Sequence, residues 1–176
     1  VDEIRHPLLR ECLKLTGLTK GMEVTSMSDI VGGTGLGSSS SFTVGLLHAL
    51  HAFKGEFCSA EQLAREACEV EIKRLKEPIG KQDQYIAAYG GFEFIEFMSN
   101  ETVRVDPVIC PHKTFAELEK RLVLLYTGMT RKAGSLLRQA RSAYRDKTHA
   151  LQRMRDLAVE TRRELQQGNI DAMGDI

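Results

Sequence analysis

The sequence predicts an α+β fold, and three observations support this prediction. Its 176 residues are 42% hydrophobic and 27% charged, which is typical of a globular protein with a substantial core. Segments with helical spacing are interspersed with short segments rich in β-branched and aromatic residues. Because these segments follow no regular strand–helix–strand period, an α+β arrangement is favoured over a doubly wound parallel sheet.

Net charge and cysteine content exclude several functional classes for this protein. The formal net charge is zero, which argues against a general binder of nucleic acid or of membrane surfaces. No apolar run reaches the length of a membrane span, so we expect neither nucleic-acid nor membrane partners. The four cysteines form no CxxC pair, and we expect them to be free thiols in a cytoplasmic protein: Cys12, Cys58, Cys68 and Cys110.

The first half of the chain is predicted to be mainly helical. One helix begins at Pro7 and ends at Gly17. Residues 22–30 predict a strand that leads into a glycine-rich segment. A further helix begins with the Ser59–Gln62 capping box and ends before Pro78, and a short helix or turn follows over 81–91. Between the glycines and this capping box, a helix over 38–54 has apolar residues at helical spacing: Phe42, Leu46, Ala49, Leu50 and Phe53.

The second half predicts strands and then helices. Residues 92–98 and 102–106 predict two strands joined by a turn at Ser99-Asn100. The segment 121–128, "RLVLLYTG", predicts a buried strand. Two helices follow, one lined by Ala133, Leu137, Ala140 and Tyr144, the other by Leu151, Met154, Ala158, Thr161 and Leu165.

Residues 32–42, "GGTGLGSSSSF", predict a phosphate-binding loop. Glycines let backbone N–H groups approach an anion closely, and the N-terminus of the following helix adds unpaired donors and a favourable dipole. Two common glycine motifs do not fit: Ser38 stands where a P-loop requires lysine, and the GxGxG spacing differs from the dinucleotide fingerprint. The alternative is a glycine turn whose serines only cap the helix.

Glu71 is the second candidate functional residue. It lies among apolar positions of the third helix, whereas Glu69 points to the opposite side. Since a buried carboxylate needs a partner, Glu71 is either a magnesium ligand or a member of an inward salt bridge, unless its face is partly exposed.

The glycine segment resembles the central motif of the GHMP kinases. The match includes Gly33, Gly35, Leu36, Gly37, Ser38 and Ser39, while Val31 replaces the family's proline. The resemblance implies Mg²⁺ binding by Ser39 and Glu71. It also implies that Asp83, in "EPIGKQDQYIAAYGGF", accepts the proton of the attacking hydroxyl. ATP phosphates would be bound by Gly33, Thr34, Gly35, Leu36, Gly37, Ser38 and Ser39.

Three longer segments extend this resemblance over nearly the whole chain. "SSSSFTVGLLHALHAFKG", the Asp83 segment and "LLYTGMTRKAGSLL" are most similar to the D-glycero-D-manno-heptose 7-phosphate kinases within the family. The similarity implies phosphorylation of the anomeric hydroxyl of a sugar phosphate to the 1,7-bisphosphate. Thr130 and Arg131 would then contact the sugar phosphate, unless Arg131 is merely solvated. An L-fucokinase-type sugar kinase and a non-catalytic nucleotide-binding fragment are the alternatives.

The family resemblance also implies two domains. Residues 1–112 would belong to the ribosomal protein S5 domain 2-like ATP-binding domain, and residues 113–176 would begin a ferredoxin-like domain. We expect the family's N-terminal motif and its C-terminal glycine-rich motif to lie outside this chain. It would then be incomplete at both ends and inactive alone. The resemblance leaves open whether the protein forms a homo-oligomer.

Overall fold

The computed structural model describes residues 1–29, 32–126 and 148–176. These residues divide into two compact units, one formed by residues up to Gly90 and one beginning at Gly91. Helices and strands are both present, as the sequence predicts. The predicted domain boundary at 112/113 stays a prediction, and the helix predicted around 133–144 lies outside the described residues.

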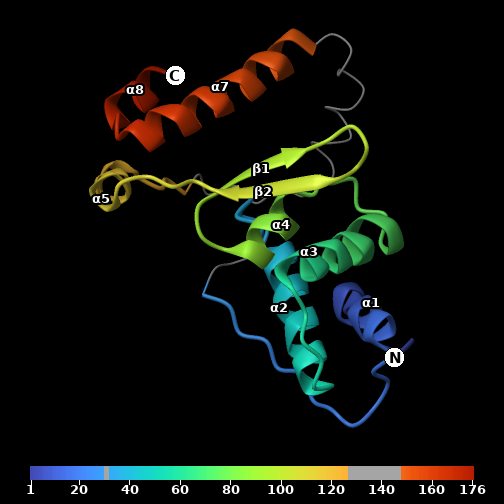
Figure 1. The fold of residues 1–176 in the computed structure, drawn as a ribbon. Coiled ribbons are helices and arrows are strands. Elements are labelled where there is room, and N and C mark those ends of the chain that lie inside the picture. Colours follow the sequence, from blue (N-terminus) through green and yellow to red (C-terminus); the bar gives the residue numbers. More distant parts are fainter. Residues whose placement is uncertain (30–31, 127–147) are drawn as a thin grey trace. The chain divides into compact units, whose positions relative to one another are not determined.

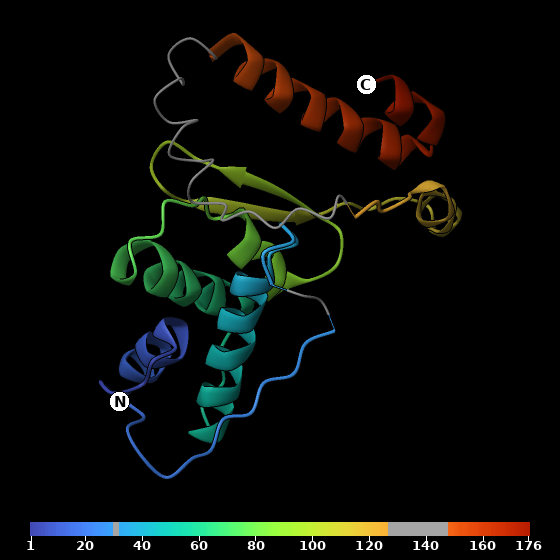
Figure 2. The same cartoon turned by 180° about the vertical axis from the view of Figure 1, so that it is seen from behind.

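The first unit is helical. Helices α1 and α3 lie on the same side of α2 in both views (Figures 1 and 2), and α4 also packs on α2. The chain begins α2 directly after the glycine segment, so this central helix carries the candidate phosphate loop at its N-terminus. The elements of the unit are α1 (Pro7–Thr16), α2 (Ser38–Phe53), α3 (Ala60–Cys68), the π-helical turn η1 (Glu69–Arg74) and α4 (Gln82–Tyr89).

Local signals explain where these helices begin and end. Pro7 occupies the first turn of α1, and Gly17 closes it with φ 72°, a left-handed conformation that suits glycine. The side chain of Ser59 accepts a hydrogen bond from the backbone N–H of Gln62 at 3.2 Å, so the predicted N-cap of α3 is confirmed. The reciprocal half of the capping box is wrong: among the described residues, the Gln62 side-chain oxygen accepts no hydrogen bond from the backbone N–H of Ser59, and the Gln62 amide N–H donates to Glu66.

The buried face of α2 differs from the predicted one. Leu46 and Leu50 are buried, but Ala49 and Phe53 are exposed. Helix α2 contacts α1, α3 and α4, so the buried part of its circumference is wider than a single stripe. It also carries inward hydroxyls. The buried residues are Ser40, Thr43, Val44, Leu46, Leu47, Leu50 and His51.

The predicted third helix changes its winding before it ends. After Cys68 the chain makes the π-helical turn η1, which buries Val70 and Glu71. A π-helical turn inserts an extra residue per turn, so it shifts the faces that a regular 3.6-residue spacing assigns. Such turns are frequent at functional sites, and this one carries the candidate metal ligand.

The second unit combines a hairpin with helices. Strands β1 (Glu93–Phe97) and β2 (Val103–Pro107) pair antiparallel with Ile95 opposite Val105, which confirms the two predicted strands. Helix α7 (Thr148–Gln167) confirms the last predicted helix, and its Arg162 guanidinium lies 4.6 Å from the ring centre of Phe94. Helices α5 (His112–Arg121) and α8 (Ile170–Asp175) complete the described part of this unit.

Two predicted strands are wrong. Residues 22–29 form no strand, and Met27 is 91% exposed. Residues 122–126 also form no strand, and Leu124 and Leu125 are each 80% exposed, so this segment is not buried either. A strand requires a neighbour for its backbone hydrogen bonds, and β1 and β2 pair only with each other among the described strands.

The cysteines are free, as predicted. Cys12 and Cys58 are buried, and Cys68 and Cys110 are half-buried. Burial raises the pKa of the Cys12 thiol to about 12, so this thiol is unreactive at neutral pH. Among the described residues, no helix combines the length and the apolar character needed to cross a membrane.

Candidate active site

The glycine segment adopts a conformation suited to binding an anion. Gly33, Gly35 and Gly37 have φ angles of 82°, 83° and 69°, all in the left-handed region that favours glycine. Gly37 is the N-cap of α2 and provides no side-chain hydrogen bond, and the first turn of α2 contains no acidic residue. Backbone N–H groups at this helix end are therefore available to a phosphate, and the helix dipole favours its charge.

A hollow of about 930 Å³ lies beside this helix end. Its walls include Gly33, Ser38 and Ser39 on the glycine side, and residues 24–29 on another side. His6 and Phe42 also line it, and their rings lie 5.1 Å apart. The hollow thus combines the phosphate-loop backbone with flat apolar surfaces, which are the features that a nucleotide requires.

Glu71 is fully buried beside the N-terminal turns of α2. Its Oε1 atom accepts hydrogen bonds from Ser39 at 3.0 Å and from Thr43 at 2.8 Å. Its Oε2 atom accepts from Ser40 at 2.8 Å and from the amide of Gln84. All four donors are neutral groups, so the carboxylate is held by hydrogen bonds and not by a salt bridge to any of them.

The Ser39–Glu71 pair fits an octahedral magnesium ion. Two neighbouring oxygen ligands of Mg²⁺ lie about 2.9 Å apart when each metal–oxygen distance is about 2.0–2.1 Å. Ser39 Oγ and Glu71 Oε1 lie 3.0 Å apart. Ser39 is also exposed, whereas Ser40, Thr43 and Gln84 are buried, so a cation would approach Glu71 from the Ser39 side.

Asp83 lies against the phosphate loop. A Cβ atom placed on Gly37 would be 3.5 Å from Asp83 Cγ, so the carboxyl group and the N-cap of α2 are in close proximity. Partial burial, followed by the charge of Glu71, raises the pKa of Asp83 above its ordinary value of 3.8. A carboxylate with a raised pKa is a better proton acceptor than an exposed aspartate.

The structure brings together most of the site residues named from the sequence. Gly37, Ser39, Glu71 and Asp83 form one cluster, although they are spread over more than forty positions of the chain. Thr130 and Arg131 lie outside the described residues.

Sequence reasoning missed Ser40, Thr43 and Gln84, which hold Glu71 in place. A hydroxyl pair at helical spacing among buried apolar residues was the available signal for Ser40 and Thr43. Gln84 follows Asp83 directly, and no pattern in the sequence singles it out.

Comparisons with known proteins find similarity to sugar kinases. The model of the family described as GHMP kinases N terminal domain matches residues 6–91. A D-glycero-alpha-D-manno-heptose 7-phosphate kinase of Campylobacter jejuni is 40% identical over 106 residues, which are 60% of this chain and 31% of that protein. A bifunctional fucokinase/GDP-fucose pyrophosphorylase of Arabidopsis thaliana is 26% identical over 189 aligned positions, covering 99% of this chain and 18% of that protein.

A solved structure shares the fold. A crystal structure described as a D-glycero-D-manno-heptose 1-phosphate kinase from Bacteroides thetaiotaomicron has a TM-score of 0.79 and 28% identity, over 94% of this chain and 50% of that chain. This chain therefore spans half or less of the length of each of these relatives.

Proposed function

We propose, from the match of residues 6–91 to the family model described as GHMP kinases N terminal domain, that the chain is part of an ATP-dependent sugar kinase. The single observation that carries this proposal is the buried carboxylate of Glu71 bonded to Ser39 at the end of a phosphate-binding loop. A carboxylate and a hydroxyl beside such a loop are the groups that hold a phosphate-bound magnesium ion.

Each group has a distinct role in this proposal. The backbone of Gly33, Gly35 and Gly37, with the N-terminus of α2, binds and orients the phosphates of ATP. Ser39 and Glu71 hold Mg²⁺, which when bound neutralises charge on the transferred phosphoryl group. Asp83 accepts the proton of the attacking sugar hydroxyl. Catalysis then rests on positioning and charge stabilisation, as in other phosphoryl transfers.

The proposed substrate is a heptose 7-phosphate, phosphorylated at its anomeric hydroxyl. The kinase of Campylobacter jejuni named for that substrate supports this choice, because it is 40% identical over 106 residues. The fucokinase of Arabidopsis thaliana aligns with nearly the whole chain, and it makes L-fucose the second candidate. The proposed location of the protein is the cytoplasm, where ATP is available.

A substrate assay with the complete protein tests this proposal. We expect ATP- and magnesium-dependent transfer to heptose 7-phosphate, giving a second phosphate on the anomeric carbon that ³¹P NMR resolves. L-fucose and D-galactose serve as competing sugars. Faster transfer to L-fucose would make L-fucose, and not heptose 7-phosphate, the substrate. If the folded, ATP-bound protein transfers phosphate to none of these sugars, a non-catalytic nucleotide-binding role is favoured.

A further inference from the structure

A second cluster of chemically active side chains lies at the other end of α2. His51 is in the last turn of α2, Cys58 follows in the loop, and Glu66 is on α3. One ligand atom from each of these three residues lies within 4.8 Å of the other two. His51 and Ser38 are 13 residues apart on one helix, so the cluster is about 20 Å from the phosphate loop.

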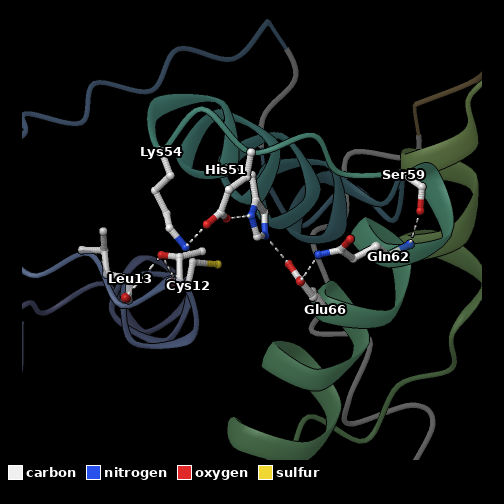
Figure 3. A network of polar contacts seen from close by, with 9 residues as sticks. Cys12, Leu13, His51, Lys54, Ser59, Gln62 and Glu66 are labelled. Carbon is white, nitrogen blue, oxygen red and sulfur yellow. Dashed lines mark hydrogen bonds and ion pairs between the residues drawn. The ribbon is translucent and has the colours of Figure 1, made fainter.

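The hydrogen bonds of His51 are unusual for a buried histidine. The His51 side chain is 9% exposed, and both ring nitrogens face carboxylates: Nδ1 lies 2.9 Å from Glu56, and Nε2 lies 2.7 Å from Glu66 (Figure 3). A neutral imidazole has one N–H and can therefore donate to only one of them. The second nitrogen needs either a proton or a metal ion between it and its carboxylate.

A protonated His51 satisfies both carboxylates without a metal. Burial opposes the charged ring, but the hydrogen bonds to Glu66 and Glu56 outweigh it and raise the pKa of His51. This arrangement leaves the position of Cys58 without a role. Cys58 is only 7% exposed, and its sulfur belongs to the same group of ligand atoms.

A metal ion accounts for every member of the cluster. Nitrogen, sulfur and carboxylate oxygen together are ligands of zinc, whereas magnesium selects oxygen alone. We propose that His51, Cys58 and Glu66 form a zinc-binding site, in which Nε2 of His51 is the nitrogen ligand. Nδ1–H of His51 then donates to Glu56, the arrangement by which a second carboxylate commonly orients a metal-bound histidine.

Neighbouring residues hold the carboxylates in position. The amide of Gln62 donates to Oε1 of Glu66 at 2.9 Å and leaves Oε2 for the metal (Figure 3). Lys54 pairs with Oε1 of Glu56 at 2.8 Å. Ligand atoms around a tetrahedral zinc lie about 3.3–3.8 Å apart. Nε2 of His51 and Oε2 of Glu66, which are 2.7 Å apart, therefore separate slightly when the ion binds, while the more widely spaced atoms of the group, which lie within 4.8 Å of one another, close by up to about 1 Å.

The proposed site connects three parts of the first unit. It ties the C-terminal turn of α2 to the following loop and to α3 through three protein ligands. Because the unfolded chain does not present these ligands together, zinc binding stabilises the folded state.

Zinc titration of the complete, tag-free protein tests the proposal. After removal of metal, we expect one Zn²⁺ to bind per chain with a rise in Tm, and Co²⁺ to give a thiolate-to-cobalt absorption band. Cys58→Ser should weaken zinc binding by more than about 100-fold, and Glu56→Gln by roughly 10- to 100-fold, as for an outer-shell partner. Cys68→Ser, on α3 but outside the cluster, is the matched control and should bind zinc like the wild type.

Two outcomes would overturn the zinc site. One is an absence of stoichiometric zinc binding, which would mean that a protonated His51 forms ion pairs with both Glu56 and Glu66. The other is equal affinity in the wild type and in Cys58→Ser. Circular dichroism of each metal-free variant shows whether that variant is folded. Because Cys58→Ser changes a single atom, this variant keeps the test valid even if substitutions of His51 unfold the protein.

Discussion

The two ends of α2 hold carboxylates in opposite ways. At the N-terminal end, Glu71 accepts hydrogen bonds from neutral hydroxyls and an amide, and one of these hydroxyls, Ser39, is exposed. At the C-terminal end, Glu56 and Glu66 face the ring of His51, with a thiol beside them. A set of oxygen atoms suits a hard cation such as Mg²⁺, whereas a set containing nitrogen and sulfur suits zinc. One helix thus separates a proposed reaction centre from a proposed structural one.

Asp83→Asn should have the largest effect of the variants considered. The amide cannot accept the proton of the sugar hydroxyl, and general-base assistance is typically worth roughly 10²–10⁴-fold. We expect turnover of the complete protein to fall by about that factor, with nucleotide affinity nearly unchanged. Steady-state kinetics and ATP titration measure the two quantities. A near-normal rate would reduce Asp83 to a positioning residue.

Glu71→Gln should lower turnover by about 100-fold or more, since loss of a ligand costs at least as much as loss of an outer-shell partner. It should also destabilise the fold by about 1–3 kcal/mol, because the new amide N–H₂ group meets hydroxyls that were donating to the carboxylate. Glu69→Gln is the matched control on the same turn: Glu69 pairs with Lys73 at the surface, so turnover should stay close to that of the wild type. Equal effects of the two variants would contradict a metal-binding role for Glu71.

Gly37→Val should weaken ATP binding by about 10-fold or more. A residue with a side chain pays about 1–2 kcal/mol for the left-handed conformation that Gly37 adopts, and 1.4 kcal/mol corresponds to a factor of ten in affinity. Its side chain would also contact Asp83. Isothermal titration of the complete protein with ATP measures the change, and unchanged affinity would remove the loop from the nucleotide site.

Selective metal removal distinguishes the proposed roles of the two ends of α2, one in stability and one in turnover. A chelator that binds zinc but leaves magnesium free should lower Tm by about 5 °C or more relative to the zinc-saturated protein. Turnover at 25 °C with excess magnesium should persist, because the proposed zinc ligands contact neither ATP nor sugar. A loss of turnover without a change in Tm would mean that zinc acts in the reaction and not in the fold.

The sequence predicted what depends on local signals. Pro7, Gly17 and Ser59 mark helix ends through interactions with their own neighbours, and these ends are confirmed. The strands predicted within 22–30 and 121–128 are absent from the described parts of these segments, 22–29 and 121–126, because pairing depends on a partner that a single segment does not specify. Helix α5 (His112–Arg121) was not predicted, because the segment between Pro111 and the apolar run after it carries no clear apolar stripe.

The site shows the same division between local and distant information. The glycine conformation follows from the residue type, so the loop could be predicted from composition and spacing. The inward position of Glu71 was also predicted, because a charged residue among apolar positions is conspicuous. Its partners Ser40 and Thr43 are 31 and 28 residues away in sequence, and only the folded chain brings them to the carboxylate.

The most direct test of the proposed magnesium site compares Ser39→Ala with Ser40→Ala in the complete protein. Both variants remove one hydroxyl from Glu71, but only Ser39 is exposed on the side from which a cation can approach. Ser39→Ala should raise the magnesium concentration needed for half-maximal turnover by about 10-fold, with little loss of stability. Ser40→Ala should instead lower the free energy of unfolding by about 1 kcal/mol and leave the magnesium requirement unchanged. Equal magnesium requirements in the two variants would contradict a metal site formed by Ser39 and Glu71.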